Sequence, residues 1–338
     1  MDLVSVIIPV YQVSDYVERC LNSVMSQTYS DIECIIVDDA TQDDSIAKCE
    51  RLIKEYNGTI KFRILHHDKN IGLSAARNTG TKAATGDYLY YLDSDDYISP
   101  DCIEKLIEPF KEDNALEMVQ GNCLKIFGEE EIIFYKGASL HITNNDDIRK
   151  HYLTPHQNIY ISVWNKLLKR SFVEKNTLYC KEGIIYEDHL WMFYLIKYLR
   201  DAYLCDIITY YYPLRSGSIV TSSDKRTKGN SFSKIFNEIL ENLSEGKERE
   251  ELYAYVHIFC KRYLTFVKDV PALKESADLY KKSARKYRSW YVFLVLNLII
   301  SIRQRTAALK VIGWLNRFRW KAYSLFCFQR GEYLHLLG

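Results

Sequence analysis

Two acidic clusters follow apolar runs in the first hundred residues of the chain. Asp93-Ser94-Asp95 follows the run 87–92, and Asp38-Asp39 follows the run 32–37. At the end of a strand, residues two positions apart point to the same side, so Asp93 and Asp95 can face one ligand. Mg²⁺ and Mn²⁺ prefer oxygen ligands, usually one or two carboxylates together with substrate phosphates. The spacing therefore predicts a divalent metal site that would neutralise a leaving diphosphate.

A solvated acidic turn is the alternative for the first cluster, with Asp96 or Ser99 capping the next helix. A lone Asp-x-Asp pattern is short and would favour that alternative. The Asp93-Ser94-Asp95 cluster, however, lies at a strand end beside a second acidic pair, and this position favours the metal site. In that second pair, Asp38 and Asp39 can accept hydrogen bonds from a base or from ribose hydroxyls. Otherwise they shape a turn in which Asp43 caps the following helix.

Alternating apolar and amphipathic segments must position these acidic residues. Strands are predicted over 3–10, 32–37, 61–66 and 87–92, and helices over 14–25, 44–56 and 73–84. Ser14 is expected to cap the first helix. Such alternation predicts an α/β fold, a mainly parallel sheet with helices on both faces. Ligands of these sheets bind beyond the carboxyl ends of the strands, and all four ends here are polar.

One basic residue lies near this predicted site. Arg77 is one turn inside the third helix, close to Asn70 and Gly72, and can approach a phosphate. A solvated arginine without a specific partner is the alternative. Two other phosphate-binding motifs are absent. Tyr11-Gln12 stands where the Gly-x-Gly-x-x-Gly of a dinucleotide-binding domain would begin, and the Gly-x-x-x-x-Gly-Lys-Ser/Thr of a nucleotide triphosphatase does not occur.

The remainder of the chain is predicted to contain short strands, then a loop, and then helices. Short strands are expected over 118–127, 132–135 and 203–212, and the Ser-, Gly- and Lys-rich stretch 215–231 is predicted to be a loop. Beyond that loop the apolar spacing is helical. Residues 281–338 hold twelve Lys and Arg against one acid, although the whole chain carries a net charge of only +1. This asymmetry indicates an anionic partner surface.

Composition limits the class of protein. Apolar residues make up 47% and charged residues 26%, as in a globular domain. The nine cysteines form no Cys-x-x-Cys pair, which favours reduced thiols over a disulfide framework or a zinc ribbon. No basic leader precedes the first strand, so a cytoplasmic protein without a signal peptide is expected. The apolar run Trp290–Ile302 is shorter than the roughly 17–25 residues that a spanning helix needs.

Several ordered motifs resemble the family 2 glycosyltransferases of the GT-A fold, over about residues 3–220. The first four are Ser5-Val-Ile-Ile-Pro-Val-Tyr11, Val37-Asp-Asp39 with Asp43, Asn70-x-Gly72-x-Ser74-x-x-Arg77-Asn78, and Gly86-Asp-Tyr with Leu92-Asp-Ser-Asp-Asp96. Two more, Val163-Trp-Asn-Lys-Leu-Leu-Lys-Arg170 and Arg215-Ser-Gly-Ser-Ile219, are similar to segments of the bacterial polysaccharide-building branch. Between them, Tyr186-Glu-Asp-His-Leu-Trp191 resembles the Glu-Asp segment that supplies the family's catalytic base. The departures are mild: Gln12 replaces Asn, and Ala40-Thr-Gln replaces Gly-Ser-Thr.

The resemblance implies a role for each matching residue. Asp95 would bind Mn²⁺ or Mg²⁺, and Asp188 would be the general base, with Glu187 holding acceptor or donor hydroxyls. The nucleotide sugar would be bound by Pro9, Val10, Tyr11, Asp38, Asp39, Asn70, Arg77, Asp93 and Ser94. Trp164, Arg215 and Ser218 would contact the acceptor or the diphosphate. The alternative for Glu187 and Asp188 is that they only precede a helix over 190–199. The positive end of the helix dipole stabilises acidic side chains at that position.

The predicted protein is an inverting hexosyltransferase with a UDP-sugar donor and a growing surface glycan, lipid-linked or free, as acceptor. Its GT-A domain is expected over 1–225, with a nucleotide-sugar half at 1–98 and an acceptor half at 99–225. A basic helical extension over 226–338 would attach it to the inner face of the plasma membrane. The alternative is that the apolar helix of this extension packs on the catalytic domain and leaves its basic face in solvent. No nucleic-acid partner is expected, because no recognition motif accompanies the charge. A non-catalytic binding module on this fold is the alternative. A nucleotidyltransferase is disfavoured, since it would carry a Gly-rich triphosphate loop.

Overall fold

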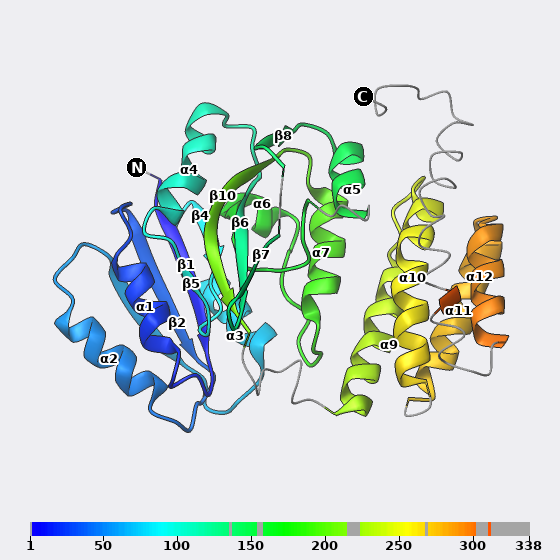
Figure 1. The fold of residues 1–338 in the computed structure, drawn as a ribbon, viewed down its shortest axis with the longest axis horizontal. Coiled ribbons are helices and arrows are strands. Elements are labelled where there is room, and N and C mark those ends of the chain that lie inside the picture. The colour runs from blue at the N-terminus through cyan, green and yellow to red at the C-terminus, as the bar shows by residue number, and fades with distance from the viewer. Residues whose placement is uncertain are drawn as a thin grey trace. The chain divides into compact units, whose positions relative to one another are not determined.

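The computed structural model describes residues 2–134, 137–153, 158–214, 224–267, 270–301 and 310–311. The chain divides into two compact units, Met1–Ser222 and Ser223–Gly338. The first unit contains the sheet and its flanking helices, and the second is helical (Figure 1).

The elements of the first unit are as follows. Its strands are β1 (Val4–Val10), β2 (Ile32–Asp38), β3 (Lys61–His66), β4 (Tyr88–Tyr91), β5 (Tyr97–Ile98), β6 (Met118–Phe127), β7 (Glu130–Ile133), β8 (Leu140–Ile142), β9 (Lys166–Lys169) and β10 (Ala202–Pro213). Its helices are α1 (Val17–Met25), α2 (Ser45–Glu55), α3 (Leu73–Ala83), α4 (Cys102–Glu112), α5 (Asn145–Leu153), α6 (Arg170–Lys175) and α7 (Glu187–Tyr198).

The strands form one mixed sheet in the order β3-β2-β1-β4-β9-β6-β10-β5, with β7 paired to β6 and β8 to β10. The first four strands of that order are parallel, because each is connected to the next strand in the chain by a helix. Strand β9 is antiparallel to both of its neighbours, β4 and β6. The carboxyl ends of β1, β2, β3 and β4 therefore meet at one edge of the sheet.

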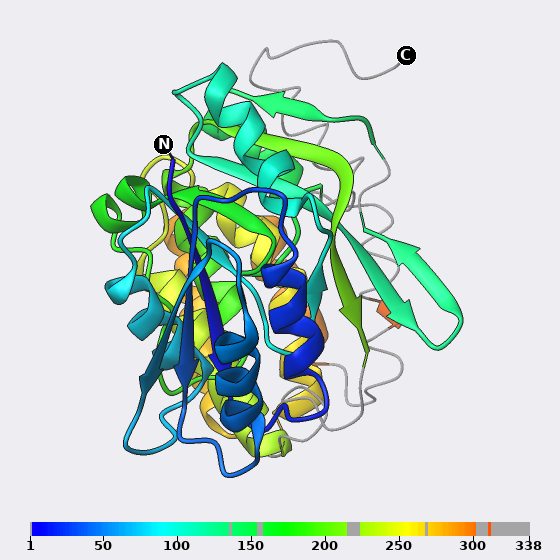
Figure 2. The ribbon, with the colours of Figure 1, turned by 90° about the vertical axis from the view of Figure 1, so that its left-hand side faces the viewer.

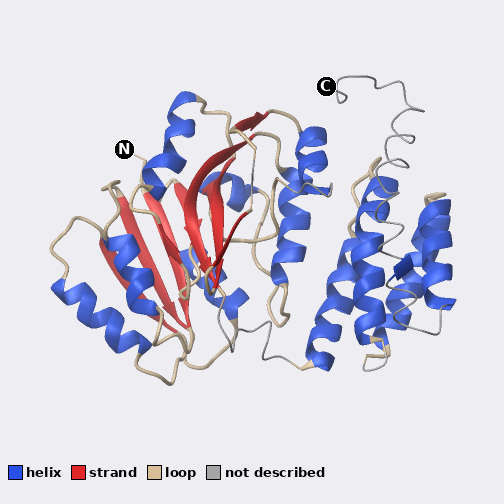
Figure 3. Ribbon diagram, viewed as in Figure 1, coloured by secondary structure: helices blue, strands red, loops and turns tan. Residues whose placement is uncertain are grey.

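Side chains alternate across β1 to build a core on each face of the sheet. Val4, Val6 and Ile8 share a buried cluster with residues of α1, α2 and α4. Ile7 points to the opposite face, where Gly80 lets α3 approach closely: a Cβ at Gly80 would lie 2.3 Å from Ile7 Cγ2. Figure 2 shows α1 and α2 in front of the strands, and Figure 3 shows helices on both faces. The α/β sandwich predicted from the alternating segments is confirmed.

The structure corrects the predicted start of the first helix. Helix α1 begins at Val17, and Ser14 does not cap it. The Ser14 hydroxyl is instead hydrogen-bonded to Asp44 and accepts from Lys48 Nζ at 2.8 Å, because the loop after β1 lies against the start of α2. Asp43 accepts a hydrogen bond from the backbone N–H of Ser45, the first residue of α2. Strand β9 was not predicted, since its four residues give too short a pattern.

The second unit is built from α9 (Lys225–Glu241), α10 (Glu248–Phe266), α11 (Ala272–Lys286) and α12 (Trp290–Ser301). Its core is aromatic: the Phe259 ring meets Phe236 edge-on at 5.0 Å and lies 5.1 Å from Tyr280. Among the described residues, no helix is long and apolar enough to cross a bilayer. The cysteines described in both units are buried free thiols, as expected.

Candidate active site

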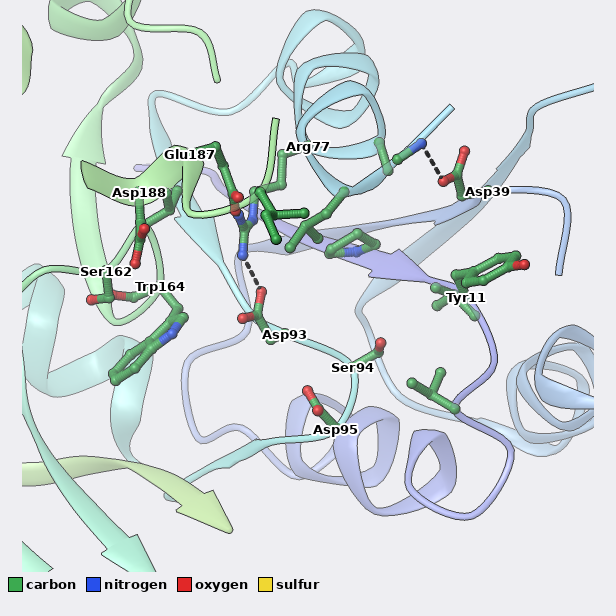
Figure 4. Close-up of a pocket in the computed structure, with 18 of the residues that line it drawn as sticks. Tyr11, Asp39, Arg77, Asp93, Ser94, Asp95, Ser162, Trp164, Glu187 and Asp188 are labelled. Atoms are coloured by element: carbon green, nitrogen blue, oxygen red, sulfur yellow. Dashed lines mark hydrogen bonds and ion pairs between the residues drawn. The ribbon is translucent and has the colours of Figure 1, made fainter. Parts of the chain in front are cut away.

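A pocket of about 530 Å³ opens beyond the carboxyl ends of β1, β2 and β4. Residues that follow these strands line one side, and the segments 162–164 and 184–188 line the other (Figure 4). The pocket-lining residues predicted from the sequence are Pro9, Val10, Tyr11, Asp39, Asn70, Arg77, Asp93, Ser94, Asp95, Trp164, Glu187 and Asp188. The fold thus brings residues that are up to 179 positions apart in the chain to one cavity.

Three predicted site residues are not in this group. Asp38 does not line the pocket. Its carboxylate accepts from the backbone N–H of Thr41 at 2.8 Å and is hydrogen-bonded to His66 at 2.9 Å, so it stabilises the turn after β2. Arg215 and Ser218 lie outside the described residues. Pocket residues that the sequence did not suggest include Tyr212. A strand over 203–212 was predicted, but the sequence did not show which end of that strand faces the site.

Asp39 supports the loop between β3 and α3. Its carboxylate is buried and accepts from the backbone N–H of Ile71 at 2.9 Å and of Gly72 at 2.8 Å. His67 Nδ1 lies 2.8 Å from the same carboxylate. Gly72, with φ of 95°, adopts a left-handed conformation that favours glycine. These bonds hold Asn70 at the pocket, and a further bond from Asp39 to a nucleotide stays a prediction.

Arg77 connects the two sides of the pocket. Its guanidinium is buried and donates from Nη2 to Asp93 Oδ1 at 2.6 Å and from Nη1 to Glu187 Oε1 at 2.5 Å. Burial opposes its charge, but Asp93 and then Glu187 raise the pKa of Arg77 above its ordinary value. Only Nε is left without a hydrogen-bond partner among the described residues. Arg77 therefore tethers the start of α7 to the end of β4.

Replacing Arg77 with Met should destabilise the first unit by about 3–5 kcal/mol, the usual cost of leaving buried charges without their partner. Glu187 and Asp93 would both lose their cation. Urea denaturation followed by circular dichroism measures the change. Arg63→Met is the matched control, because Arg63 pairs with Glu33 with 42% of its side chain exposed and should cost at most about 1 kcal/mol. Equal losses in the two variants would contradict this interpretation of Arg77.

The adjacent carboxylates Glu187 and Asp188 begin α7 and point to different places. Glu187 points to Arg77, whereas Asp188 points toward Ser162 and Trp164 (Figure 4). Successive side chains on a helix diverge by about 100°, which explains this division. Tyr186, just before them, has φ of 64°, a conformation that non-glycine residues seldom adopt and that often marks functional sites. Asp188 Oδ1 accepts from the backbone N–H of His189 at 2.9 Å.

The surroundings of Asp188 favour proton transfer near neutral pH. Burial raises its pKa to about 6, with the Arg77 cation and the His189 N–H opposing this shift. A base is most effective when its pKa is close to the working pH. Asp188 is therefore a stronger base than an exposed aspartate and is still largely ionised at pH 7.

An aromatic wall faces Asp188. The Trp164 ring stacks on Tyr210 with centroids 4.4 Å apart and an angle of 11°, and Tyr212 lies 5.6 Å away. Buried Asn165 fixes this wall from behind: its amide donates to Asn122 O at 2.9 Å, and its carbonyl accepts from Thr209 at 2.9 Å. Aromatic faces of this kind bind the apolar faces of sugar rings and bases.

The acidic cluster after β4 is not a simple solvated turn. Asp93 and Asp95 line the pocket, and Asp93 Oδ2 accepts no hydrogen bond from the described residues. Asp96 is buried and accepts from the Tyr210 hydroxyl at 2.6 Å, while the next helix, α4, has Asp101 at its N-cap. The alternative with Asp96 or Ser99 as cap is therefore wrong. Two carboxylates at one pocket edge are the hard oxygen donors that Mg²⁺ and Mn²⁺ prefer, so the residues present fit a divalent metal.

A second group of possible metal ligands lies elsewhere. Ligand atoms of Asp113, His141 and Asp201 lie within 4.8 Å of one another. Asp201 precedes the start of β10, whereas Tyr212 of the pocket is near its end. An extended strand rises about 3.3 Å per residue, so roughly 30 Å separate this group from the pocket. His141 Nε2 is hydrogen-bonded to Asp201 at 2.7 Å, which explains the cluster without a metal.

The fold is that of the GT-A glycosyltransferases, as the motifs predicted. Residues 5–177 match the sequence model of glycosyl transferase family 2, and the chain belongs to that family. It is 36% identical over 187 residues to the glycosyltransferase GlyA of Streptococcus pneumoniae, which covers 52% of this chain and 25% of GlyA. The chain thus spans about a quarter of the length of that relative.

Solved structures share the fold at low sequence identity. Staphylococcus aureus TarS 1–349 in complex with UDP-GlcNAc has a TM-score of 0.59 at 17% identity, covering 85% of this chain and 92% of that one. The mannosyltransferase PcManGT of Pyrobaculum calidifontis, in complex with GDP-Man and Mn²⁺, has a TM-score of 0.57 at 14% identity, covering 94% and 87%. At these identities the comparison establishes the fold alone.

Proposed function

We propose that the protein is an inverting glycosyltransferase that moves a hexose or hexosamine from a UDP-sugar to a growing surface glycan. One observation carries the proposal: Asp93 and Asp95 line one side of the pocket, and the base candidate Asp188 lines the other. Inversion needs the leaving diphosphate and the attacking hydroxyl on opposite faces of the anomeric carbon. The complex of the similarly folded TarS with UDP-GlcNAc supports UDP as the nucleotide.

Roles in the donor site follow from position. Pro9, Val10 and Tyr11 after β1 would contact the base, and Asp39 and Asn70 the ribose. Asp93 and Ser94 would lie beside the diphosphate. Arg77 would act on the donor mainly by fixing Asp93, since Asp93 and Glu187 already occupy both of its Nη groups.

Asp188 would accept the proton of the acceptor hydroxyl as that oxygen attacks the anomeric carbon. Trp164 would hold the acceptor sugar within reach of that carboxylate. Asp95, assisted by Asp93, would hold a divalent metal, which when bound supplies positive charge against the departing diphosphate. Glu187 would keep α7 in place through Arg77.

The experiment that tests the proposal is a panel of nucleotide sugars assayed for released nucleotide with Mn²⁺ present. UDP release from one UDP-sugar, stimulated by a nitrophenyl glycoside acceptor, is the expected result. The stereochemistry of the product, followed by NMR, tests inversion. A non-catalytic binding module would bind UDP and release nothing from any donor, which would overturn the proposal.

The helical unit supports the predicted membrane attachment through α12. Trp290, Leu294 and Leu298 repeat every fourth residue and are 63%, 65% and 48% exposed. Exposed Lys286 and Arg288 precede this apolar stripe directly. Such a helix lies in the interface of an anionic bilayer, with each basic residue contributing about 1 kcal/mol.

The full chain should float with phosphatidylglycerol vesicles at low salt. Leu294→Ser should weaken the partition at least tenfold, because burying one leucine contributes about 1.5–3 kcal/mol. Ile207→Ser, a change at an equally apolar side chain of β10 that is 43% exposed, is the matched control and should float like the wild type. Failure of the wild type to float at low salt would rule out attachment through α12.

A further inference from the structure

Lys166 is a buried cation with no role in the reaction described above. Its side chain is fully buried at the start of β9, in the centre of the sheet between β4 and β6. Burying an ammonium group is costly unless hydrogen bonds replace its water. A leucine or methionine would fill the same volume without that cost, so the cation requires an explanation.

The partners of Lys166 all lie in the segment just before it. Lys166 Nζ donates to the Ser162 carbonyl at 2.8 Å, to the Ser162 hydroxyl at 3.0 Å and to the Tyr160 carbonyl at 3.2 Å. It also lies 4.6 Å from the centre of the Tyr160 ring. An ammonium has three hydrogens, and all three are used to close one turn of the chain.

That turn carries the aromatic wall of the pocket. Ser162, Val163 and Trp164 line the cavity, and the Ser162 hydroxyl donates to the Trp164 carbonyl at 3.0 Å. The side chain of Asp188 points toward this segment (Figure 4). A single cation therefore holds the turn that carries the wall on which an acceptor would rest.

Charge connects Lys166 with Asp188. Burial lowers the pKa of Lys166 to about 7, while the Asp188 carboxylate opposes that shift. In turn, Lys166 is one of the groups that oppose the rise in the pKa of Asp188 caused by burial, after Arg77 and the His189 N–H. Asp93 acts in the other direction, and Glu187 is the remaining carboxylate beside Asp188.

We propose that Lys166 is the positioning residue of the acceptor site: it holds the 160–164 turn so that Trp164 and Asp188 face the same acceptor sugar. This inference rests on the proposed function, because it assumes that Asp188 is the base. Lys166 itself touches neither the donor nor the acceptor.

Lys166→Met tests the inference on the full chain, with the UDP-sugar and the nitrophenyl glycoside that the wild type uses. UDP affinity by calorimetry should stay within about twofold, because the donor half is unchanged. The KM for the acceptor should rise at least tenfold. Removing the cation raises the pKa of Asp188, so the acid limb of the pH profile of kcat/KM should move to higher pH. Lys169→Met, at the far end of the same strand, should change none of these values.

Two further variants keep the inference testable if Lys166→Met does not fold. Ser162→Ala removes one partner of the ammonium and should raise the acceptor KM by a smaller factor, without moving the acid limb. Lys166→Arg keeps the charge and should keep the acid limb of the wild type. A wild-type acceptor KM and acid limb in Lys166→Met would overturn this inference alone. A wild type that transfers no sugar would instead overturn the proposed function.

Discussion

Asp188→Asn should lower turnover at least a hundredfold while UDP affinity stays near that of the wild type. A hydroxyl is a weak nucleophile at neutral pH, and a positioned base typically contributes about 10²–10⁴-fold. Asparagine has the same shape and cannot accept the proton. The Asp188 carboxylate accepts one backbone hydrogen bond, from His189, so the local structure should survive the change.

The pH profile gives a second measure of the same role. Asp188 acts as a base only when ionised, and burial raises its pKa to about 6. Transfer by the wild type should therefore fall about tenfold per pH unit below that value and level off above it. The residual activity of Asp188→Asn should not show this fall at acid pH. Steady-state rates between pH 4.5 and 8, with calorimetric UDP binding at each pH, separate the base from the binding step.

Glu187→Gln is the comparison that assigns the base to one residue. Glu187 accepts a hydrogen bond from Arg77 and points away from the aromatic wall, so its loss should lower stability more than it alters the pH profile. If Asp188→Asn turned over normally and Glu187→Gln were inactive, the base would be Glu187. If both remained active, the motif would have a structural role only.

Asp95→Asn should abolish the response to metal. The wild type is expected to lose activity at least about a hundredfold in EDTA and to regain it with Mn²⁺ or Mg²⁺, because positive charge beside a leaving diphosphate contributes several kcal/mol. Asp95→Asn should match the EDTA-treated wild type with or without added metal. Its thermal unfolding should be unchanged, since Asp95 lines the pocket rather than the core.

The Asp113, His141 and Asp201 cluster provides the control for this experiment. His141→Ala removes its imidazole, roughly 30 Å from the pocket by strand length. That variant should respond to EDTA and metal like the wild type. Loss of metal dependence in His141→Ala would indicate that the metal binds at the cluster of Asp113, His141 and Asp201 and not at Asp95. Full activity of the wild type in EDTA would show that the transfer does not require a metal.

The fold of the nucleotide half could be predicted from the sequence in unusual detail. Strands β1, β2 and β4 are largely apolar runs and β3 alternates polar and apolar residues, while amphipathic helices intervene, so the local pattern determines the element type. Strand β9 escaped prediction because its four residues take their strand conformation from pairing with β4 and β6. Parallel pairing also brings the strand ends together, which is why the acidic residues could be placed at one edge.

The sequence by itself determined which chemical groups are available. Carboxylates follow the ends of parallel strands, and the motifs of a known family assign roles to them. Only the tertiary structure decided which groups meet. Arg77 lies between Asp93 and Glu187, although Glu187 is 110 residues away, and so connects the two sides of the pocket. Glu187 and Asp188 face different groups, and Lys166 donates a hydrogen bond to the carbonyl of Ser162, two residues before Trp164. These contacts depend on the packing of segments distant in the chain, and no local pattern of residues encodes such distances.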